Sequence, residues 1–448
     1  MKKSFYSALL SISLLSFTGY SQQTAAPTQT FQELMDLGVV QSRQGNYPLA
    51  QNYFTQAIQL QPDNAVAYYS RGVTKSNLKD NRGAINDFDK AIELNPRYSD
   101  AYIGRGTSKA RQEDHKGALQ DYNRGIDLNP VDANAYFSRG YSKSKLENFK
   151  GALSDYNKSL DLTPDNALGY AARGVVRQKL EDYKGSLEDF SKAIELSPKR
   201  PSSYSGRAYS KMKMADYKGA IADYGKALEI SPEDAESLYY RGYCKSQTED
   251  FAGAQIDFDR ALSQDPENAP AYYGRGFAKN KLGHTKEAID DFNKAIAIGN
   301  IETKKVLYAG PITKQVLDEL RSGVSERLKM AEMTAERSEV YYNRGLSKAK
   351  IGDTKAAIED YNKAIALNPT FAEAYFTRGM VKSQIGDQRG AIQDCSNALK
   401  LNPKYAEAYY VRGIIRHALG DTDGCNDLSK AGELGYTAAY AVIRDYCN

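Results

Sequence analysis

Small, aromatic and charged side chains recur along the chain with a period of 34 residues. Proline marks the period, and an aromatic residue, a glycine and an alanine recur at fixed distances from it. Self-similarity at a period of about 20 to 50 residues is typical of repeat arrays. The prolines that define the period are Pro62, Pro96, Pro130, Pro164, Pro198, Pro232, Pro266, Pro369 and Pro403.

The pattern of residues within each 34-residue unit predicts two antiparallel helices. When the proline is numbered 32, position 8 is almost always Gly, position 20 is usually Ala, and positions 4 and 24 are mostly aromatic. The small residues allow the two helices to approach closely, while the aromatic residues fill the space between units. Asp or Asn at position 16, as in Asn46, Asp216 and Asp421, suits the N-cap of the second helix, and the proline then ends that helix.

This pattern resembles the tetratricopeptide repeat family, which has an aromatic residue at positions 4 and 24, Gly at 8, Ala at 20 and 27, and Pro at 32. The match covers about residues 31–435 in eleven regular units. The resemblance implies an all-α fold, a right-handed α-solenoid superhelix of stacked helix-turn-helix repeats. It leaves the function open, because the same scaffold holds many unrelated partners.

The repeats divide the chain into six segments. We expect a signal peptide at 1–21, a linker at 22–30, eight repeats at 31–300, an irregular helical unit at 301–337, three repeats at 338–435 and a capping helix at 436–448. In the irregular unit, Pro311 is expected to end a first helix early, and apolar residues every four positions from Ile312 to Leu328 predict one long amphipathic helix. This unit is either a degenerate repeat or an insert that changes the direction of the superhelix or presents a partner site between the two arrays.

The first residues predict export from the cytoplasm. Lys2 and Lys3 precede an apolar stretch from Phe5 to Phe17, and small residues follow up to Ser21. This order is typical of a secretory signal, so we expect cleavage near Ser21 and a periplasmic or secreted protein. Without the two lysines the formal net charge falls from +4 to +2, which argues against nucleic acid as a partner. The rest of the chain has no apolar stretch of about 18 residues, so no membrane span is expected.

Charged residues form a second periodic pattern inside the repeats. Position 7 is Arg and position 11 is basic in ten of eleven units, and position 23 is Asp in nine. The basic residues either bind an acidic partner or pair with the Asp of the same unit. The first unit favours pairing, because Leu37, Gln41 and Tyr53 replace all three charges together, and a buried charge left alone is costly. Representative members of this predicted salt-bridge ladder are Arg71, Asp87, Arg207, Asp223, Arg344 and Asp360.

The resemblance implies that the first helices line a concave groove, with positions 2, 5, 9 and 12 facing it. Aromatic residues concentrate at these positions in the seventh and eighth units and predict a patch that anchors an extended or helical peptide. The alternative is that these side chains pack against neighbouring helices and meet no ligand. The candidate partner-binding residues are Tyr239, Tyr240, Tyr243, Tyr273, Phe277, Tyr342, Phe376 and Tyr410.

Histidine and cysteine are sparse and scattered. His115, His284 and His417 occupy different repeat positions, so we expect neither a metal site nor a cofactor. Cys425 and Cys447 lie in the closing segment and are predicted to form a disulfide in an oxidising compartment. Cys244 and Cys395, at positions 10 and 24, are interpreted as packing residues.

These patterns predict a protein without catalytic activity. No nucleophile elbow or phosphate-binding glycine loop is present in the sequence. We expect a protein–protein interaction scaffold of the bacterial cell envelope that binds a partner protein or peptide in its groove. The alternative is a binding module for a small ligand or a glycan, which the 34 Tyr suggest. The oligomeric state stays open.

Overall fold

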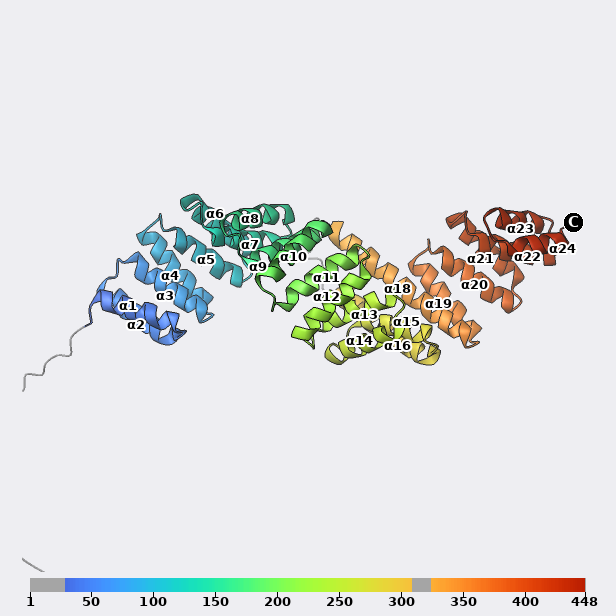
Figure 1. Cartoon of the computed structure of the whole chain (residues 1–448), viewed down its shortest axis with the longest axis horizontal. Coiled ribbons are helices and arrows are strands. Elements are labelled where there is room, and N and C mark those ends of the chain that lie inside the picture. The colour runs from blue at the N-terminus through green and yellow to red at the C-terminus, as the bar shows by residue number, and fades with distance from the viewer. Residues whose placement is uncertain (1–28, 308–323, 448) are drawn as a thin grey trace, which may run out of the picture. The chain divides into compact units, whose positions relative to one another are not determined.

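The structure, a computed structural model, describes residues 29–307 and 324–447, which form 23 helices and no strand (Figure 1). The predicted signal peptide lies outside these residues, as do Pro311, Ile312 and most of the predicted amphipathic helix. Within the described residues, no helix combines the length and the apolar character that crossing a membrane requires.

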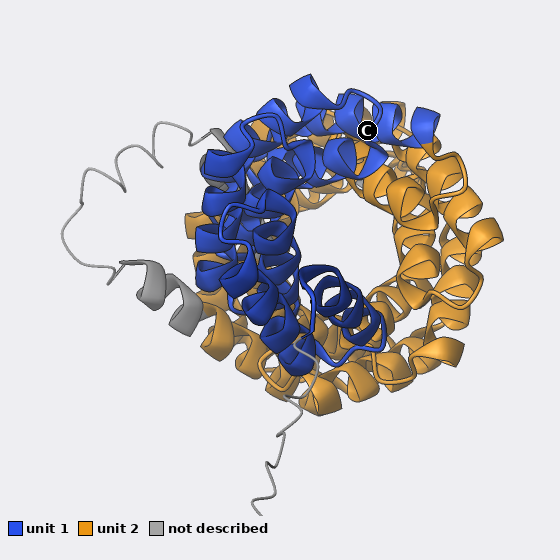
Figure 2. Ribbon diagram, turned by 90° about the vertical axis from the view of Figure 1, so that its left-hand side faces the viewer, with its two compact units in different colours: residues 1–162 blue, residues 163–448 orange. Residues whose placement is uncertain are grey.

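The helices belong to two compact units, residues 1–162 and 163–448, and each unit is a stack of helix pairs (Figure 2). The first unit contains α1 (Phe31–Arg43), α2 (Tyr47–Leu60), α3 (Ala65–Asn77), α4 (Asn81–Leu94), α5 (Ser99–Arg111), α6 (His115–Leu128), α7 (Ala133–Lys145) and α8 (Phe149–Leu162). The second unit contains α9 (Ala167–Lys179), α10 (Tyr183–Leu196), α11 (Pro201–Lys213), α12 (Tyr217–Ile230), α13 (Ala235–Gln247), α14 (Phe251–Gln264), α15 (Ala269–Lys281), α16 (Thr285–Leu307), α18 (Val324–Lys350), α19 (Thr354–Leu367), α20 (Ala372–Gln384), α21 (Gln388–Leu401), α22 (Ala406–Ala418), α23 (Asp423–Glu433) and α24 (Ala438–Tyr446). The predicted all-α solenoid of helix-turn-helix repeats is confirmed.

The core of each repeat lies where a small residue of the first helix meets an aromatic residue of the second. A Cβ atom at Gly72 would lie 2.8 Å from the ring of Phe88, and Phe88 is itself buried. The sixth repeat accepts Ala208 at the same position, packed near Tyr224. The helices therefore approach as closely as the side chain at position 8 permits, which explains why that position stays small.

The predicted N-caps form in eight of the repeats. The side chain at position 16 accepts a hydrogen bond from the backbone N–H three residues later, as Asp216 does from Gly219 at 2.9 Å. Asn46 occupies the N-cap position of α2 as predicted, but its side chain makes no capping bond and donates to Gln41 instead. The prediction was wrong for Asp421, because the last repeat is one residue shorter and α23 begins after Thr422.

The irregular segment lengthens the two helices beside it. α16 has 23 residues and α18 has 27, against 13 or 14 in the regular repeats. α16 continues past Asn300 because the helix-ending proline is absent there. α18 begins at Val324 and passes without a break through Ser338, where the first helix of the ninth repeat was expected to begin.

The ninth repeat nevertheless stacks directly on the eighth. Arg344 Nη1 donates to Asn293 Oδ1 at 2.7 Å, and Val340 packs in the cluster that contains Phe292. The equivalent bond between regular neighbours, Arg378 to Asn362, joins residues 16 apart instead of 51. These contacts do not decide between the two interpretations of 301–337, because residues 308–323 lie outside the described residues.

Deleting residues 303–337 is therefore expected to leave the fold intact, because the deletion restores the 34-residue phase. The melting temperature should shift by less than about 4 °C, the equivalent of about 1 kcal/mol. Circular dichroism during heating measures this shift. Deleting residues 303–334 is the control. It leaves three extra residues between the eighth and ninth repeats and should therefore destabilise the stack. Equal melting of the two deletion proteins would contradict the direct stacking.

Candidate functional site

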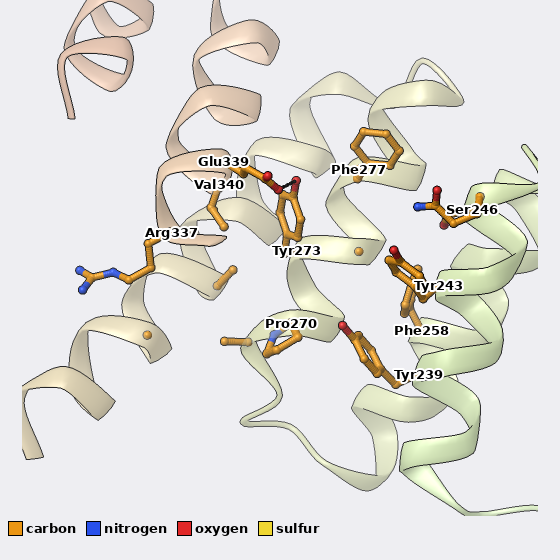
Figure 3. A pocket seen from close by; sticks show the side chains of 15 residues that line it. Tyr239, Tyr243, Ser246, Phe258, Pro270, Tyr273, Phe277, Arg337, Glu339 and Val340 are labelled. Carbon is orange, nitrogen blue, oxygen red and sulfur yellow. Dashed lines mark hydrogen bonds between the residues drawn. The ribbon is translucent and has the colours of Figure 1, made fainter. Parts of the chain in front are cut away.

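An apolar cavity of about 580 Å³ opens beside the first helices of the seventh, eighth and ninth repeats (Figure 3). Tyr239 and Tyr243 reach it from α13, and Tyr273 and Phe277 reach it from α15. Residues of α16 and α18, among them Val340, complete its wall. The aromatic residues of each helix are four residues apart, so each pair lies on one helix face.

Beside the cavity, one repeat position lacks an aromatic residue that other repeats have. In the ninth and tenth repeats, position 34 is aromatic and covers position 5: the ring centroids of Tyr342 and Phe371, and of Phe376 and Tyr405, are 4.8 Å apart. In the seventh repeat, position 34 is Asn268, whose side chain caps α15. A short polar residue thus replaces the ring that would fill the space above Tyr239.

The structure brings together only some of the predicted groove residues. Tyr240 lines a second, smaller cavity of about 350 Å³ together with Tyr209 and Tyr224, instead of the first cavity. Tyr342, Phe376 and Tyr410 each pack against an aromatic residue of the following segment; the Tyr410 and Tyr436 centroids lie 4.6 Å apart. These three side chains therefore pack against neighbouring parts of the chain, which was the alternative to binding a ligand.

Two of the polar side chains that line the cavity contact each other. The Tyr273 hydroxyl donates to Glu339 at 3.5 Å and accepts from the Asn343 amide at 3.0 Å. Burial raises the pKa of Tyr243, and the carboxylate of Glu339 adds to this effect. The apolar interior with a few polar groups beside it suits an aliphatic or aromatic side chain whose backbone stays near polar groups.

The predicted salt-bridge ladder forms in the structure. Asp223 accepts from Arg207 Nε at 2.8 Å through Oδ2 and from Nη2 at 2.7 Å through Oδ1, and Lys211 Nζ lies 2.8 Å from the same Oδ2. Burial raises the pKa of Asp223, but the hydrogen bonds from Arg207 and Lys211 outweigh it, so the pKa lies below its usual value. The other representative pairs are Arg71–Asp87 at 2.8 Å and Arg344–Asp360 at 2.6 Å. The periodic basic residues are therefore held inside their own repeats.

Most ladder arginines also make contacts that were not predicted from the sequence. Arg105 Nη1 bonds Asp89 of the preceding repeat at 2.6 Å, and its guanidinium lies 5.4 Å from the centre of the Tyr102 ring. In the sequence, the contact with the preceding repeat is marked by an oxygen-bearing side chain at position 25 of that repeat. Residues that accept this bond are Thr55, Asp89, Asn123, Ser191, Asp259, Asn293, Asn362 and Ser396.

The last repeat contains an acidic partner that counting by position did not reveal. Asp427, one position earlier than expected, accepts from Arg412 at 2.6 Å and from Arg416 at 3.0 Å. The missing residue before α23 explains the shift. The ladder therefore extends to the final repeat.

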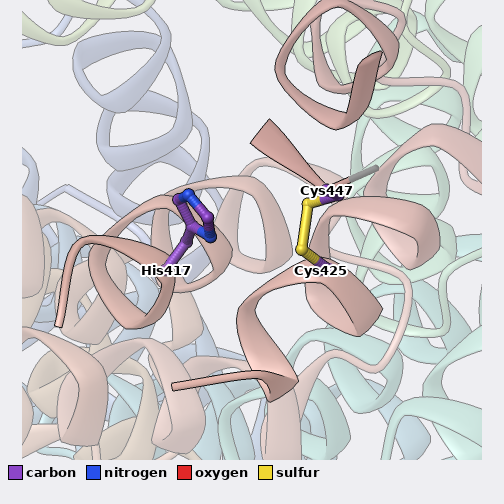
Figure 4. A group of neighbouring side chains, drawn as sticks. All are labelled: His417, Cys425 and Cys447. Carbon is purple, nitrogen blue, oxygen red and sulfur yellow. A yellow bond between two sulfur atoms is a disulfide. The ribbon is translucent and has the colours of Figure 1, made fainter. Parts of the chain in front are cut away.

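The cysteines divide into two kinds. Cys425 and Cys447 form a disulfide that ties the end of α24 to α23 (Figure 4). Cys244 and Cys395 are free and buried, and burial raises the pKa of each thiol to about 12. These two behave as packing residues.

Family models described as tetratricopeptide repeat match residues 35–74, 77–133, 133–166, 168–200, 201–234, 245–300, 338–371 and 360–393. Comparison with curated proteins finds no match. Among solved structures, YrrB, described as a TPR protein with an unusual peptide-binding site, is 21% identical over 41% of this chain and 95% of its own, with a TM-score of 0.38. A tetratricopeptide repeat protein from Parabacteroides merdae is 20% identical over 55% of this chain and 98% of its own, with a TM-score of 0.42. The C-terminal part of a TPR repeat-containing protein from Cytophaga hutchinsonii is 21% identical over 54% and 98%, with a TM-score of 0.44.

Proposed function

Because this chain belongs to the tetratricopeptide repeat family, whose domains bind protein partners, we propose that it is a scaffold that anchors a partner peptide in the cavity beside α13, α15 and α18. The convergence of four aromatic side chains from consecutive repeats carries this proposal. Aromatic residues that line a concave surface are the usual anchors of peptide recognition, and the cavity is large enough for one or two apolar side chains.

A peptide suits the cavity better than a glycan does. Saccharide recognition needs many hydrogen-bonding groups around the ligand, whereas Tyr239, Phe258 and Phe277 present mainly apolar surface. Among the polar groups that line the cavity, Glu339 and the Tyr273 hydroxyl are hydrogen-bonded to each other; Ser246, Gln247 and Arg337 line it as well. That arrangement fits a peptide with an apolar anchor side chain and a backbone amide or basic group beside it.

The proposed place of action is the cell envelope or the exterior of the cell. The signal-like first 21 residues support this location, and so does the Cys425–Cys447 disulfide, since such bonds persist in oxidising compartments. We propose no catalytic role, in keeping with a family that generally supplies non-catalytic scaffolds. Fractionation of cells that express the full chain tests the location, and a cytoplasmic pool alone would refute it.

Site-specific photocrosslinking in cells tests the partner proposal. A benzophenone amino acid in place of Gln247, which lines the cavity, is expected to capture a protein partner. Gln384 is the matched control: it is exposed and occupies the same repeat position in the tenth repeat. A protein adduct at 247 and none at 384 is the expected result. Equal capture at both positions, or no adduct at 247 together with a saccharide-induced rise in melting temperature, would overturn the proposal in favour of the ligand-binding alternative.

A further inference from the structure

Three side chains with metal-binding atoms meet in the last repeat, which the sequence analysis expected to be free of metal. His417 comes from α22, Cys425 from α23 and Cys447 from the end of α24 (Figure 4). The imidazole nitrogen and the two sulfur atoms all lie within 4.8 Å of one another. Each of the three residues is half-buried, so the cluster is accessible to small solutes yet partly shielded from water.

Two thiolates and one imidazole form a recognised ligand set for Zn²⁺, with water in the fourth position. Thiolate sulfur selects zinc over the hard cations magnesium and calcium. Around a tetrahedral zinc ion, ligand atoms bonded at about 2.0–2.3 Å are separated by roughly 3.5–4 Å. The imidazole nitrogen lies within 4.8 Å of both sulfur atoms, which are 2.07 Å apart in the disulfide. After reduction, the sulfur atoms must therefore move apart by roughly 1.5–2 Å to reach that range.

We propose that this cluster has two alternative states: the Cys425–Cys447 disulfide when oxidised, and a zinc site completed by His417 when reduced. A dithiol reductant supplies the two electrons that cleave the sulfur–sulfur bond. The reductant becomes a disulfide, and its two protons pass to Cys425 and Cys447. Zn²⁺ then displaces these two protons, bonds to both thiolates and accepts the lone pair of the neutral His417 ring.

The position of the cluster gives both states a structural role. The disulfide ties α24 to α23, whereas a zinc ion would tie α24 to both α22 and α23. Either link holds the last helix over the end of the solenoid, where Ala439 is fully buried. The other two cysteines cannot replace this pair, because Cys244 and Cys395 are buried in different repeats.

Cobalt titration of the mature chain tests the proposal. The protein is reduced with a phosphine, freed of reductant without oxygen and titrated with Co²⁺, a coloured substitute for zinc. One equivalent is expected to produce thiolate-to-cobalt charge-transfer absorption and tetrahedral visible bands, which Zn²⁺ then removes. The oxidised protein should show neither. A reduced wild-type protein without these bands would overturn the proposal.

Variants assign the ligands. The double variant Cys425→Ser/Cys447→Ser retains both buried thiols and is expected to lose the bands entirely. His417→Ala should weaken cobalt binding at least about 100-fold, since removing a ligand costs at least as much as removing its supporting partner. His284→Ala, at an exposed histidine in another repeat, is the control and should bind as wild type does. Bands that persist in the double variant, or unchanged affinity in His417→Ala, would contradict the assigned site. Circular dichroism of each variant verifies its helical content.

Discussion

Replacing Asp223 by Ala is expected to lower the free energy of unfolding by about 2–4 kcal/mol. The substitution leaves Arg207 and Lys211 without the carboxylate that both of them contact. Removing one partner of a fully buried ion pair costs about 3–5 kcal/mol, and the partial exposure of Arg207 reduces this cost. Urea denaturation followed by circular dichroism measures the change.

A double-mutant cycle tests whether Arg207 and Asp223 stabilise the fold as a pair or independently of each other. Arg207→Leu alone should also destabilise, and the double variant should lose less than the sum of the two single losses. Additive losses would show that the two residues do not act as a pair. Glu195→Ala is the control, because Glu195 forms an exposed ion pair with Lys192 at 2.7 Å and its removal should cause no measurable change.

Replacing Tyr243 and Phe277 by Ala is expected to abolish capture of the partner at position 247. Both side chains line the cavity, and central aromatic anchors of an interface typically contribute at least about 2 kcal/mol each. Each single variant should therefore weaken binding at least about 30-fold. A peptide selected from a displayed random library against the mature chain provides the ligand for calorimetric measurement.

Tyr141→Ala is the matched control for this experiment. Tyr141 occupies the same repeat position in the fourth repeat and is 46% exposed, against 38% for Tyr243. Its replacement should leave both peptide affinity and melting temperature unchanged. Equal losses of affinity in the Tyr141 and Tyr243 variants would show that the cavity is not the binding site.

The fold could be predicted because the residues that define one helix pair recur at the same positions in each 34-residue repeat. In the first repeat all three charges are replaced together, which predicted that the charges pair in the other repeats. The structure contains both representative pairs, Arg207 with Asp223 and Arg344 with Asp360. A regular pattern reveals such contacts because both partners recur at one separation in the sequence, 16 residues.

The candidate site was predictable only in part, because its shape depends on exceptions to the period. Phe376 is packed against Tyr405 at position 34, whereas Tyr239 has Asn268 at that position and lines a cavity. The ligand cluster was missed for a different reason. His417 and Cys447 come from separate helices, and only the shortened turn before α23 and the packing of α24 bring them together.

The arginine contact links neighbouring repeats with a bond whose strength differs from one joint to the next. A charged acceptor such as Asp259 makes a short, charge-assisted bond to Arg275, whereas Ser191 offers only a hydroxyl to Arg207. At Gly225 there is no side chain, so Arg241 has no such bond to that residue. This joint directly precedes the helix that carries Tyr239 and Tyr243. The joint between the sixth and seventh repeats therefore lacks a hydrogen bond that eight other pairs of neighbouring repeats have, and the first helix on its C-terminal side lines the cavity.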